Sequence, residues 1–368
     1  MTGHSHQAWP DVGLAAQQRA WLDAAEWVDL KWERAAAQAA LVRAGFARLL
    51  GDRSERIALG QNTHELVTRW LSALPLRARP RLVTTDGEFH TIRRQLDRLA
   101  EEGFPVVKVT TAPADTLAER LALAVDAHTS AVLVSSVLFE TAEIVPNLRY
   151  LAERCEREGA ALLVDAYHHL NVIPFDLAAL GLQSAFITGG GYKYCQLGEG
   201  NCFLRVPEGC SPRPVLTGWF AEFDAIDRMT AGPVGYAPGA VAFAGATYDP
   251  TSHYRAAAVF AFHADHGLTA ERLTAINRRQ VALLKAAIEQ LDVDPRVASV
   301  VAMPDERRGG FLAVRVVDAP TVAHGLRQAG VWSDTRGDVL RLGPAPYLRD
   351  QQIGTAAALL GDVLRARA

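Results

Sequence analysis

Short apolar runs alternate with longer amphipathic stretches through the middle of the chain. The apolar runs, rich in Val, Leu and Ile, cover residues 56–59, 81–85, 105–109, 131–135, 161–164, 185–188 and 201–206. Stretches with helical spacing of apolar positions separate several of them, at 91–102, 114–127 and 147–158. Because strand–helix–strand order gives parallel pairing, the pattern predicts an α/β fold with a mostly parallel central sheet and helices on both faces. A ligand site is expected beyond the carboxyl ends of the strands.

Different patterns flank this region and divide the chain into three parts. Residues 14–50 repeat apolar positions at helical intervals, which predicts an N-terminal helical arm over residues 1–50. A large domain is expected at 51–250, and its Gly- and Pro-rich end, from residue 209, is long enough to build a site. A smaller C-terminal α/β domain is expected at 251–368. Its elements are expected at 254–291 (helix), 298–302, 311–317 and 339–342 (strands) and 350–365 (helix).

Composition excludes several classes of protein. The chain has 368 residues, of which 49% are apolar and 21% charged, and its formal net charge is −3. These values are ordinary for globular domains and exclude collagen-like, disordered and nucleic-acid-coating proteins. Since the sequence has neither an apolar run of membrane-spanning length nor a basic and apolar export signal, we expect a cytoplasmic protein without membrane or nucleic-acid partners.

No metal site is expected. The four cysteines form no CxxC pair, which predicts reduced thiols. His4 and His6 are close together, but we expect a frayed terminus there rather than a ligand pair. The sequence also lacks GxxxxGK[ST], HExxH and GxSxG, so P-loop, zinc-protease and serine-hydrolase chemistry are not expected.

Lysine is scarce, and one lysine has an unusual context. Of 38 basic residues only four are lysines, Lys31, Lys108, Lys193 and Lys285. Lys193 follows a predicted strand and three glycines, which let the backbone approach a ligand closely. A lysine at a strand's end among aromatic residues loses its proton readily and can act as a nucleophilic amine. The other three lie in ordinary helical or strand segments, so Lys193 is the candidate.

A carboxylate and a phosphate cradle complete the pattern. Asp165 ends an apolar strand, where it could also serve as a helix cap, but only 28 residues separate it from Lys193, so the two side chains can share one crevice. A lysine amine and a carboxylate are the two protein groups that pyridoxal phosphate chemistry requires. Gly60, Asn62 and Thr63 precede a predicted helix, whose first amides can hold a phosphate.

The segments Asp165-Ala-Tyr-His168 and Gly191-Tyr-Lys-Tyr194 resemble the class V aminotransferase group of fold-type-I pyridoxal-phosphate enzymes, and kynureninases in particular. The resemblance runs from about residue 57 to the C-terminus. It implies that Asp165 pairs with the pyridine nitrogen, that His168 lies beside the cofactor and that Lys193 binds the cofactor covalently. It also implies a homodimer with the active site at the subunit interface.

The same resemblance assigns roles to further residues. Those implied to contact the cofactor are Asn62, Thr63, Phe89, Ser135, Tyr192, Trp219 and Thr247. Phe89 would stack on the ring, Tyr192 would bind the phosphate, and Thr247 would act from the neighbouring subunit. We also count Tyr192 with Lys193 and Asp165 among the catalytic candidates. Arg341 would hold the substrate α-carboxylate, a bidentate task that suits guanidinium.

The resemblance predicts a kynureninase-like hydrolysis of the Cβ–Cγ bond of kynurenine or a related amino acid, giving alanine and an aryl acid. Alternatives on the same scaffold are β-elimination, decarboxylation or deamination, and transamination; a catalytically silent binding protein is a further alternative. Cysteine desulfurase chemistry is disfavoured because no cysteine follows Cys210. The family's pocket-lining N-terminal segment has no counterpart in residues 1–56, so recognition of the aryl group is not supported by the sequence.

Overall fold

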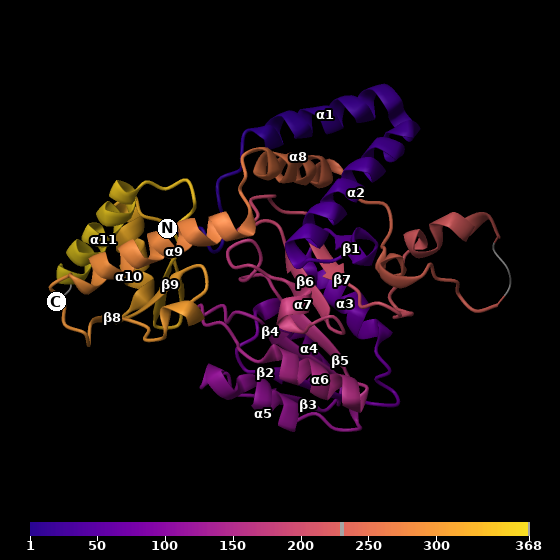
Figure 1. Cartoon of the computed structure of the whole chain (residues 1–368), viewed down its shortest axis with the longest axis horizontal. Helices are drawn as coiled ribbons and strands as arrows, with labels where there is room; N and C mark the ends of the chain where they lie inside the picture. The colour runs from indigo at the N-terminus through magenta and orange to yellow at the C-terminus, as the bar shows by residue number, and fades with distance from the viewer. Residues whose placement is uncertain (229–231, 367–368) are drawn as a thin grey trace.

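The computed structural model describes residues 1–228 and 232–366 (Figure 1). A seven-stranded sheet with the order β1-β7-β6-β5-β4-β2-β3 forms its centre. The strands are β1 (Ile57–Gly60), β2 (Arg81–Thr85), β3 (Val106–Val109), β4 (Thr129–Ser135), β5 (Ala161–Asp165), β6 (Phe186–Gly190) and β7 (Cys202–Arg205). Strands β2 to β6 pair in parallel, whereas β7 runs antiparallel to both β1 and β6. The predicted fold class is confirmed.

The reversal at β7 has a local cause. A parallel strand needs a crossover connection, usually a helix, but residues 191–201 contain no helix and turn straight back. The returning loop therefore stays at the carboxyl edge of the sheet. Lys193 lies on this loop, three residues after β6 ends.

Helices cover both faces of the sheet. They are α3 (Thr63–Ala73), α4 (His90–Glu101), α5 (Leu117–Leu123), α6 (Leu148–Glu158) and α7 (Leu177–Leu180). Two hydrophobic clusters result, one containing Trp70 of α3 and Leu96 of α4, the other containing Leu121 of α5 and Leu151 of α6. Every residue of β4 is buried, as expected for a strand between two helical layers.

The helical arm is paired with a helix from the far end of the chain. Helices α1 (Val12–Trp27) and α2 (Lys31–Leu50) pack against α8 (Thr251–Asp265), as Figure 1 shows at the top. The stretch expected to be helical, 254–291, consists of two helices, because Gly267 adopts a φ of 60° and Thr269 caps a new helix, α9 (Ala270–Glu289). Since α8 lies with the arm and α9 with the second sheet, we propose a domain boundary between them rather than at residue 250.

The C-terminal unit contains a four-stranded antiparallel sheet covered by helices. Its strands are β8 (Ala298–Val300), β9 (Leu312–Val316), β10 (Asp334–Arg336) and β11 (Val339–Leu342), and its helices are α9, α10 (Ala319–Gln328) and α11 (Asp350–Arg365). The sequence analysis missed β10 and α10. The first residues of the chain also belong here, because Gly3 N donates to Gly343 O at 2.8 Å. The expected frayed terminus is therefore wrong.

The remaining helical segments are short 3₁₀ turns. They are η1 (Val28–Leu30), η2 (Ser54–Arg56), η3 (Ala114–Thr116), η4 (Trp219–Arg228), η5 (Gly239–Phe243) and η6 (Asp305–Arg307). The segment with η4 projects from the rest of the molecule in Figure 1. Among the described residues, no helix is long and apolar enough to cross a membrane.

Gly45 tests the packing of the arm on α8. A Cβ at this position of α2 would lie 2.3 Å from the Phe260 ring, so Gly45→Ala should destabilise the protein by about 1–3 kcal/mol through overpacking. The matched control is Gly354→Ala in α11, where a Cβ meets nothing within 4 Å and should stabilise the helix by about 0.5–1 kcal/mol. Urea titration followed by circular dichroism measures both. A Gly45→Ala protein as stable as the parent would contradict this account of the interface.

Candidate active site

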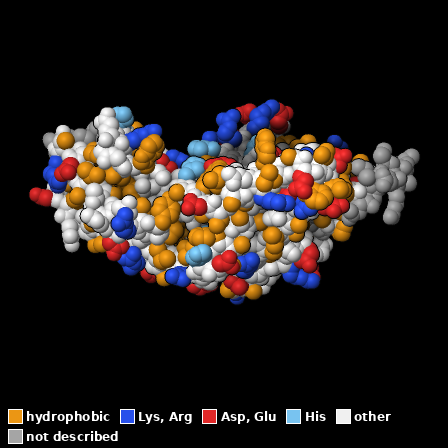
Figure 2. Space-filling view, turned by 90° about the horizontal axis from the view of Figure 1, so that it is seen from above, with side chains coloured by type: hydrophobic (Ala, Val, Ile, Leu, Met, Phe, Trp, Pro, Cys, Tyr) orange, Lys and Arg blue, Asp and Glu red, His pale blue; other side chains and the backbone are white. Residues whose placement is uncertain are grey.

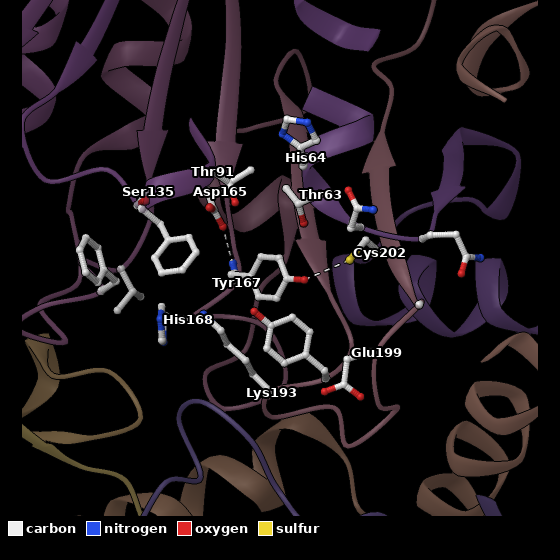
Figure 3. Close-up of a pocket in the computed structure, with 17 residues that line it drawn as sticks. Thr63, His64, Thr91, Ser135, Asp165, Tyr167, His168, Lys193, Glu199 and Cys202 are labelled. Atoms are coloured by element: carbon white, nitrogen blue, oxygen red, sulfur yellow. Dashed lines mark hydrogen bonds between the residues drawn. The ribbon is translucent and has the colours of Figure 1, made fainter. Parts of the chain in front are cut away.

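A cavity of about 210 Å³ lies at the carboxyl ends of β4, β5 and β6 (Figure 3). The strand register brings Ser135, Asp165 and Thr188 side by side at this edge. Eight of the eleven residues selected from the sequence line the cavity: Asn62, Thr63, Phe89, Ser135, Asp165, His168, Tyr192 and Lys193. The topology thus joins segments far apart in the sequence at the edge where the ligand site was expected.

The Lys193 amine is buried among rings. Its Nζ lies 2.8 Å from Nε2 of His168, and 4.7 and 5.4 Å from the ring centroids of Tyr167 and Phe89. Burial lowers the pKa of Lys193 to about 7, although the charge of Asp165 opposes the shift. Near neutral pH a large fraction of this amine is therefore uncharged and nucleophilic.

The other lysines lack such surroundings. Lys108 pairs with Asp97, Lys285 pairs with Asp305, and Lys31 lies beside the ring of Trp32. Only Lys193 lines the cavity.

The Asp165 carboxylate faces the cavity from the end of β5. One oxygen, Oδ1, accepts a hydrogen bond from Tyr167 N at 2.8 Å, while the other has no partner among the described residues. Burial raises the pKa of Asp165, so a cationic partner in the cavity would stabilise its charged form. Nδ1 of His168 is likewise buried without a partner. The unpaired oxygen of Asp165 and Nδ1 of His168 fit a heteroaromatic ligand with a protonated ring nitrogen.

The opposite end of the cavity suits a phosphate. Helix α3 begins here, and the side chain of Asn62 caps it by accepting a hydrogen bond from Glu65 N at 2.9 Å. Asn62 thus shapes the helix end, and the first helical amides remain for an anion. Burial raises the pKa of Tyr192 to about 12, which keeps its hydroxyl protonated and able to donate. Together with Lys193 and Asp165, these groups fit pyridoxal phosphate.

Ser135 is held by a carboxyl group that the sequence analysis missed. Its hydroxyl donates to Glu88 Oε2 at 2.6 Å and its backbone N to Glu88 Oε1 at 3.1 Å, and Thr85 donates to the same carboxyl. Burial raises the pKa of Glu88 to about 7. The position of Glu88 directly before Phe89, in the loop after a predicted strand, was the available signal.

Tyr167 and Cys202 also line the cavity and were missed. The Tyr167 hydroxyl lies 3.0 Å from Cys202 Sγ, as the dashed line in Figure 3 marks. Tyr167 stood inside the quoted Asp165 segment, but nothing in its spacing indicated that its ring would cover Lys193.

Comparisons with known proteins agree with this geometry. Residues 276–360 match the model of the kynureninase C-terminal domain. An uncharacterized aminotransferase of Bacillus subtilis is 23% identical over 86% of this chain and 81% of its own length. A cystine C–S lyase mutant with glycine covalently linked to its cofactor has a TM-score of 0.83 at 20% identity, over 98% of this chain and 95% of that chain. A cysteine desulfurase of Thermococcus onnurineus has a TM-score of 0.82 at 16% identity, over 99% and 94% of the two chains.

The fold is that of the class V, fold-type-I pyridoxal-phosphate enzymes. The predicted family resemblance and cofactor are confirmed at this level. Similarity to the desulfurase structures concerns the fold, since their identity to this chain is low.

Within this class V fold, Arg341 lies behind the cavity rather than in its lining. It is buried, and its Nε and Nη2 donate to the two oxygens of Asp334 at 2.7 and 2.6 Å, while Nη1 donates to Phe139 O at 2.5 Å. The charge of Arg341 lowers the pKa of both Lys193 and His168, so it acts on the same site. Its role toward a substrate carboxylate stays a prediction.

The N-terminal segment reaches this site in two places. Nε2 of His4 lies 3.0 Å from Oδ1 of Asp334, and the Ser5 hydroxyl donates to Oδ2 at 2.7 Å. Burial lowers the pKa of His4 to about 4, so its ring is neutral. The ring of His6 stacks on Tyr192 at 5.4 Å. No local pattern links residue 4 to residue 334, so this contact could not be predicted from the sequence.

Besides Arg341, two of the selected residues lie outside the cavity of their own chain. Trp219 is 45% exposed and Thr247 is exposed, both in the stretch from residue 209 to 250. Their contact with the cofactor, which the resemblance assigns to a neighbouring subunit for Thr247, stays a prediction.

The pKa of Lys193 predicts when cofactor attaches. The rate at which apo-protein binds pyridoxal phosphate covalently should rise with pH and level off above about 7, because the neutral amine is the nucleophile. An unperturbed lysine would continue to gain reactivity up to about pH 10. Stopped-flow absorbance measures the rate, with Lys285→Ala as a variant that keeps the covalent band and Lys193→Ala as one that loses it. A rate still rising at about pH 10 would refute the shift.

Proposed function

We propose that this protein is a pyridoxal-phosphate enzyme that acts on a free α-amino acid. The observation that carries the proposal is the placement of the buried Lys193 amine and the Asp165 carboxylate around one cavity, opposite the N-terminus of α3. When bound, pyridoxal phosphate withdraws electrons from the substrate Cα and makes its proton acidic.

The chain's own residues have distinct tasks in this scheme. Lys193 would hold the cofactor covalently, and its neutral amine would take the proton from the substrate Cα. Asp165 keeps the ring nitrogen protonated through a charge-assisted hydrogen bond. His168, 2.8 Å from Nζ, orients the amine, and the rings of Phe89 and Tyr167 exclude water from it.

For the overall reaction we propose kynureninase-like hydrolysis, in which water cleaves the Cβ–Cγ bond and yields alanine and a carboxylic acid. Its support is the kynureninase C-terminal match over 276–360, which contains Arg341. The second candidate is β-elimination, which the likeness to a cystine C–S lyase over 98% of this chain favours. Transamination or deamination begins with the same loss of the Cα proton, whereas α-decarboxylation would instead break the bond from Cα to the carboxylate and release CO2. We further propose a cytoplasmic homodimer.

Product analysis separates these reactions. The holoprotein is incubated with kynurenine, 3-hydroxykynurenine and cystine, and anthranilate fluorescence, alanine and pyruvate are measured. Alanine with anthranilate supports hydrolysis, whereas pyruvate supports β-elimination. Lys193→Ala should abolish either product, and Lys108→Ala, a change at an exposed ion pair, should leave it unchanged. If no amino acid alters the cofactor spectrum and no product forms, the enzymatic proposal is wrong.

Mixed dimers test the contribution of the neighbouring subunit. Thr247→Asp should weaken cofactor binding because its carboxylate repels the phosphate, and Lys193→Ala should remove covalent attachment. In a dimer of the two chains, one site combines Lys193 and Thr247 from different subunits and is intact. Co-expression should thus restore about a quarter of the parental covalent band at limiting cofactor.

Two results would contradict this dimer. One is a Thr247→Asp protein with a full band, which would mean that Thr247 does not approach the phosphate. The other is a mixed dimer without a band, which would place Thr247 in its own subunit's site.

A further inference from the structure

Arg336 is a cation beside the active site with no carboxylate partner among the described residues. It lies two residues after Asp334 on β10, so the two side chains leave the same face of the strand. Its guanidinium lies 5.9 Å from the ring centroid of Phe139, a residue that lines the cavity. Nη1 donates only to the neighbouring Thr335 O, and the buried Nε has no partner.

Other buried arginines find partners in the protein. Arg205 is paired with Asp52 and Arg341 with Asp334, and Arg255, which forms no ion pair among the described residues, donates instead to the backbone oxygens of Leu197 and Glu199. A guanidinium that is withdrawn from water without a counter-charge costs free energy, because the lost hydration is not replaced. Arg336 is half-buried and forms no ion pair among the described residues, so an anionic ligand would supply the negative charge that compensates its lost hydration.

The charge of Asp334 acts on Arg336, but its hydrogen bonds go to other groups. Asp334 already receives four hydrogen bonds, from His4, Ser5 and the fork of Arg341, so it has no capacity left for Arg336. The positive charge of Arg336 is strong enough at the site to lower the pKa of both Lys193 and His90. Figure 2 shows the hollow between the two domains from above, with basic and histidine side chains at its edge.

The two arginines lie at different depths. Arg341 is buried and donates to Phe139 O, whereas Arg336 is half-buried. Both lower the pKa of Lys193, and Arg336 also lowers that of His90, which is exposed at the start of α4. An α-carboxylate must lie close to the lysine that takes the Cα proton, so Arg336 faces the outer, side-chain end of a bound amino acid.

We propose that Arg336 binds a second anionic group on the substrate's side chain, so that the enzyme acts on an α-amino acid with an acidic side chain. This proposal rests on the proposed function. It adds a subsite on β10, separate from the cofactor and α-carboxylate contacts.

Matched acid and amide ligands test the subsite. The holoprotein is titrated with aspartate against asparagine and with glutamate against glutamine, and the change in the cofactor absorption spectrum gives Kd. Of aspartate and glutamate, we expect the one that binds more tightly to exceed its own amide in affinity by about 10- to 100-fold, because a charge-assisted hydrogen bond to Arg336 contributes a free energy of that order. Arg336→Gln should abolish this ratio and leave the amide Kd unchanged, and Arg336→Lys should retain part of the ratio.

Arg279→Gln is the matched control, because Arg279 forms an exposed ion pair with Asp350 far from the cavity; it should change neither Kd. Equal weakening of acid and amide by Arg336→Gln would assign Arg336 to the α-carboxylate and overturn the proposal. Equal Kd values in the parent protein would also overturn it, while leaving the cofactor function intact. If no amino acid changes the spectrum, the proposed function itself fails.

Discussion

The burial of one amine governs the site. Lys193 can serve as a nucleophile near neutral pH only because the fold removes water from it, and desolvation is the largest cause of its lowered pKa. This requires the loop after β6 to turn back at the carboxyl edge, so that β7 closes the sheet beside it. It also requires the rings of Phe89 and Tyr167 over Nζ, which come from the ends of other strands. The reactivity of the lysine therefore depends on the sheet topology.

The surrounding charges are arranged so that this burial is tolerable. Asp165 opposes the desolvation of Lys193, while Glu88 is satisfied by Ser135 and Thr85 and holds the end of β4 in place. Asp334 compensates Arg341 and is itself held by the N-terminal segment. Hydrogen bonds or opposite charges thus satisfy these groups in the low-dielectric interior. Arg336 forms no ion pair among the described residues, which is why we assign it to a ligand.

The part of the site that could be predicted is marked by local sequence patterns. Apolar strand runs end at Asp165 and shortly before Lys193, and Asn62 is a typical helix-capping residue. The apolar periodicity, the glycines and the helix cap were therefore enough to locate the cofactor cavity. The unpredicted features depend on contacts between distant segments. His4 meets Asp334 across most of the chain, and the break at Gly267 that separates α8 from α9 lies in a stretch whose apolar spacing continues on both sides. The contact of His4 has no local signature because it arises from tertiary packing, whereas Gly267 and the Thr269 cap were local signals for the helix break that the apolar spacing outweighed.

The division between predicted and unpredicted parts of the site corresponds to a division in function. The groups that suit a cofactor come from short motifs at the sheet edge, whereas the groups that would meet the substrate come from β10, β11 and the N-terminus. The first residues of the chain belong to this outer half, because residues 1–6 pair with Gly343 and reach both Asp334 and Tyr192. The outer half acts on Lys193 only through the charges of Arg341, Arg336 and Asp334, whereas burial is the largest cause of the lowered pKa. Similarity in the cofactor half therefore identifies the chemistry at Cα more securely than the side chain that is cleaved or transferred.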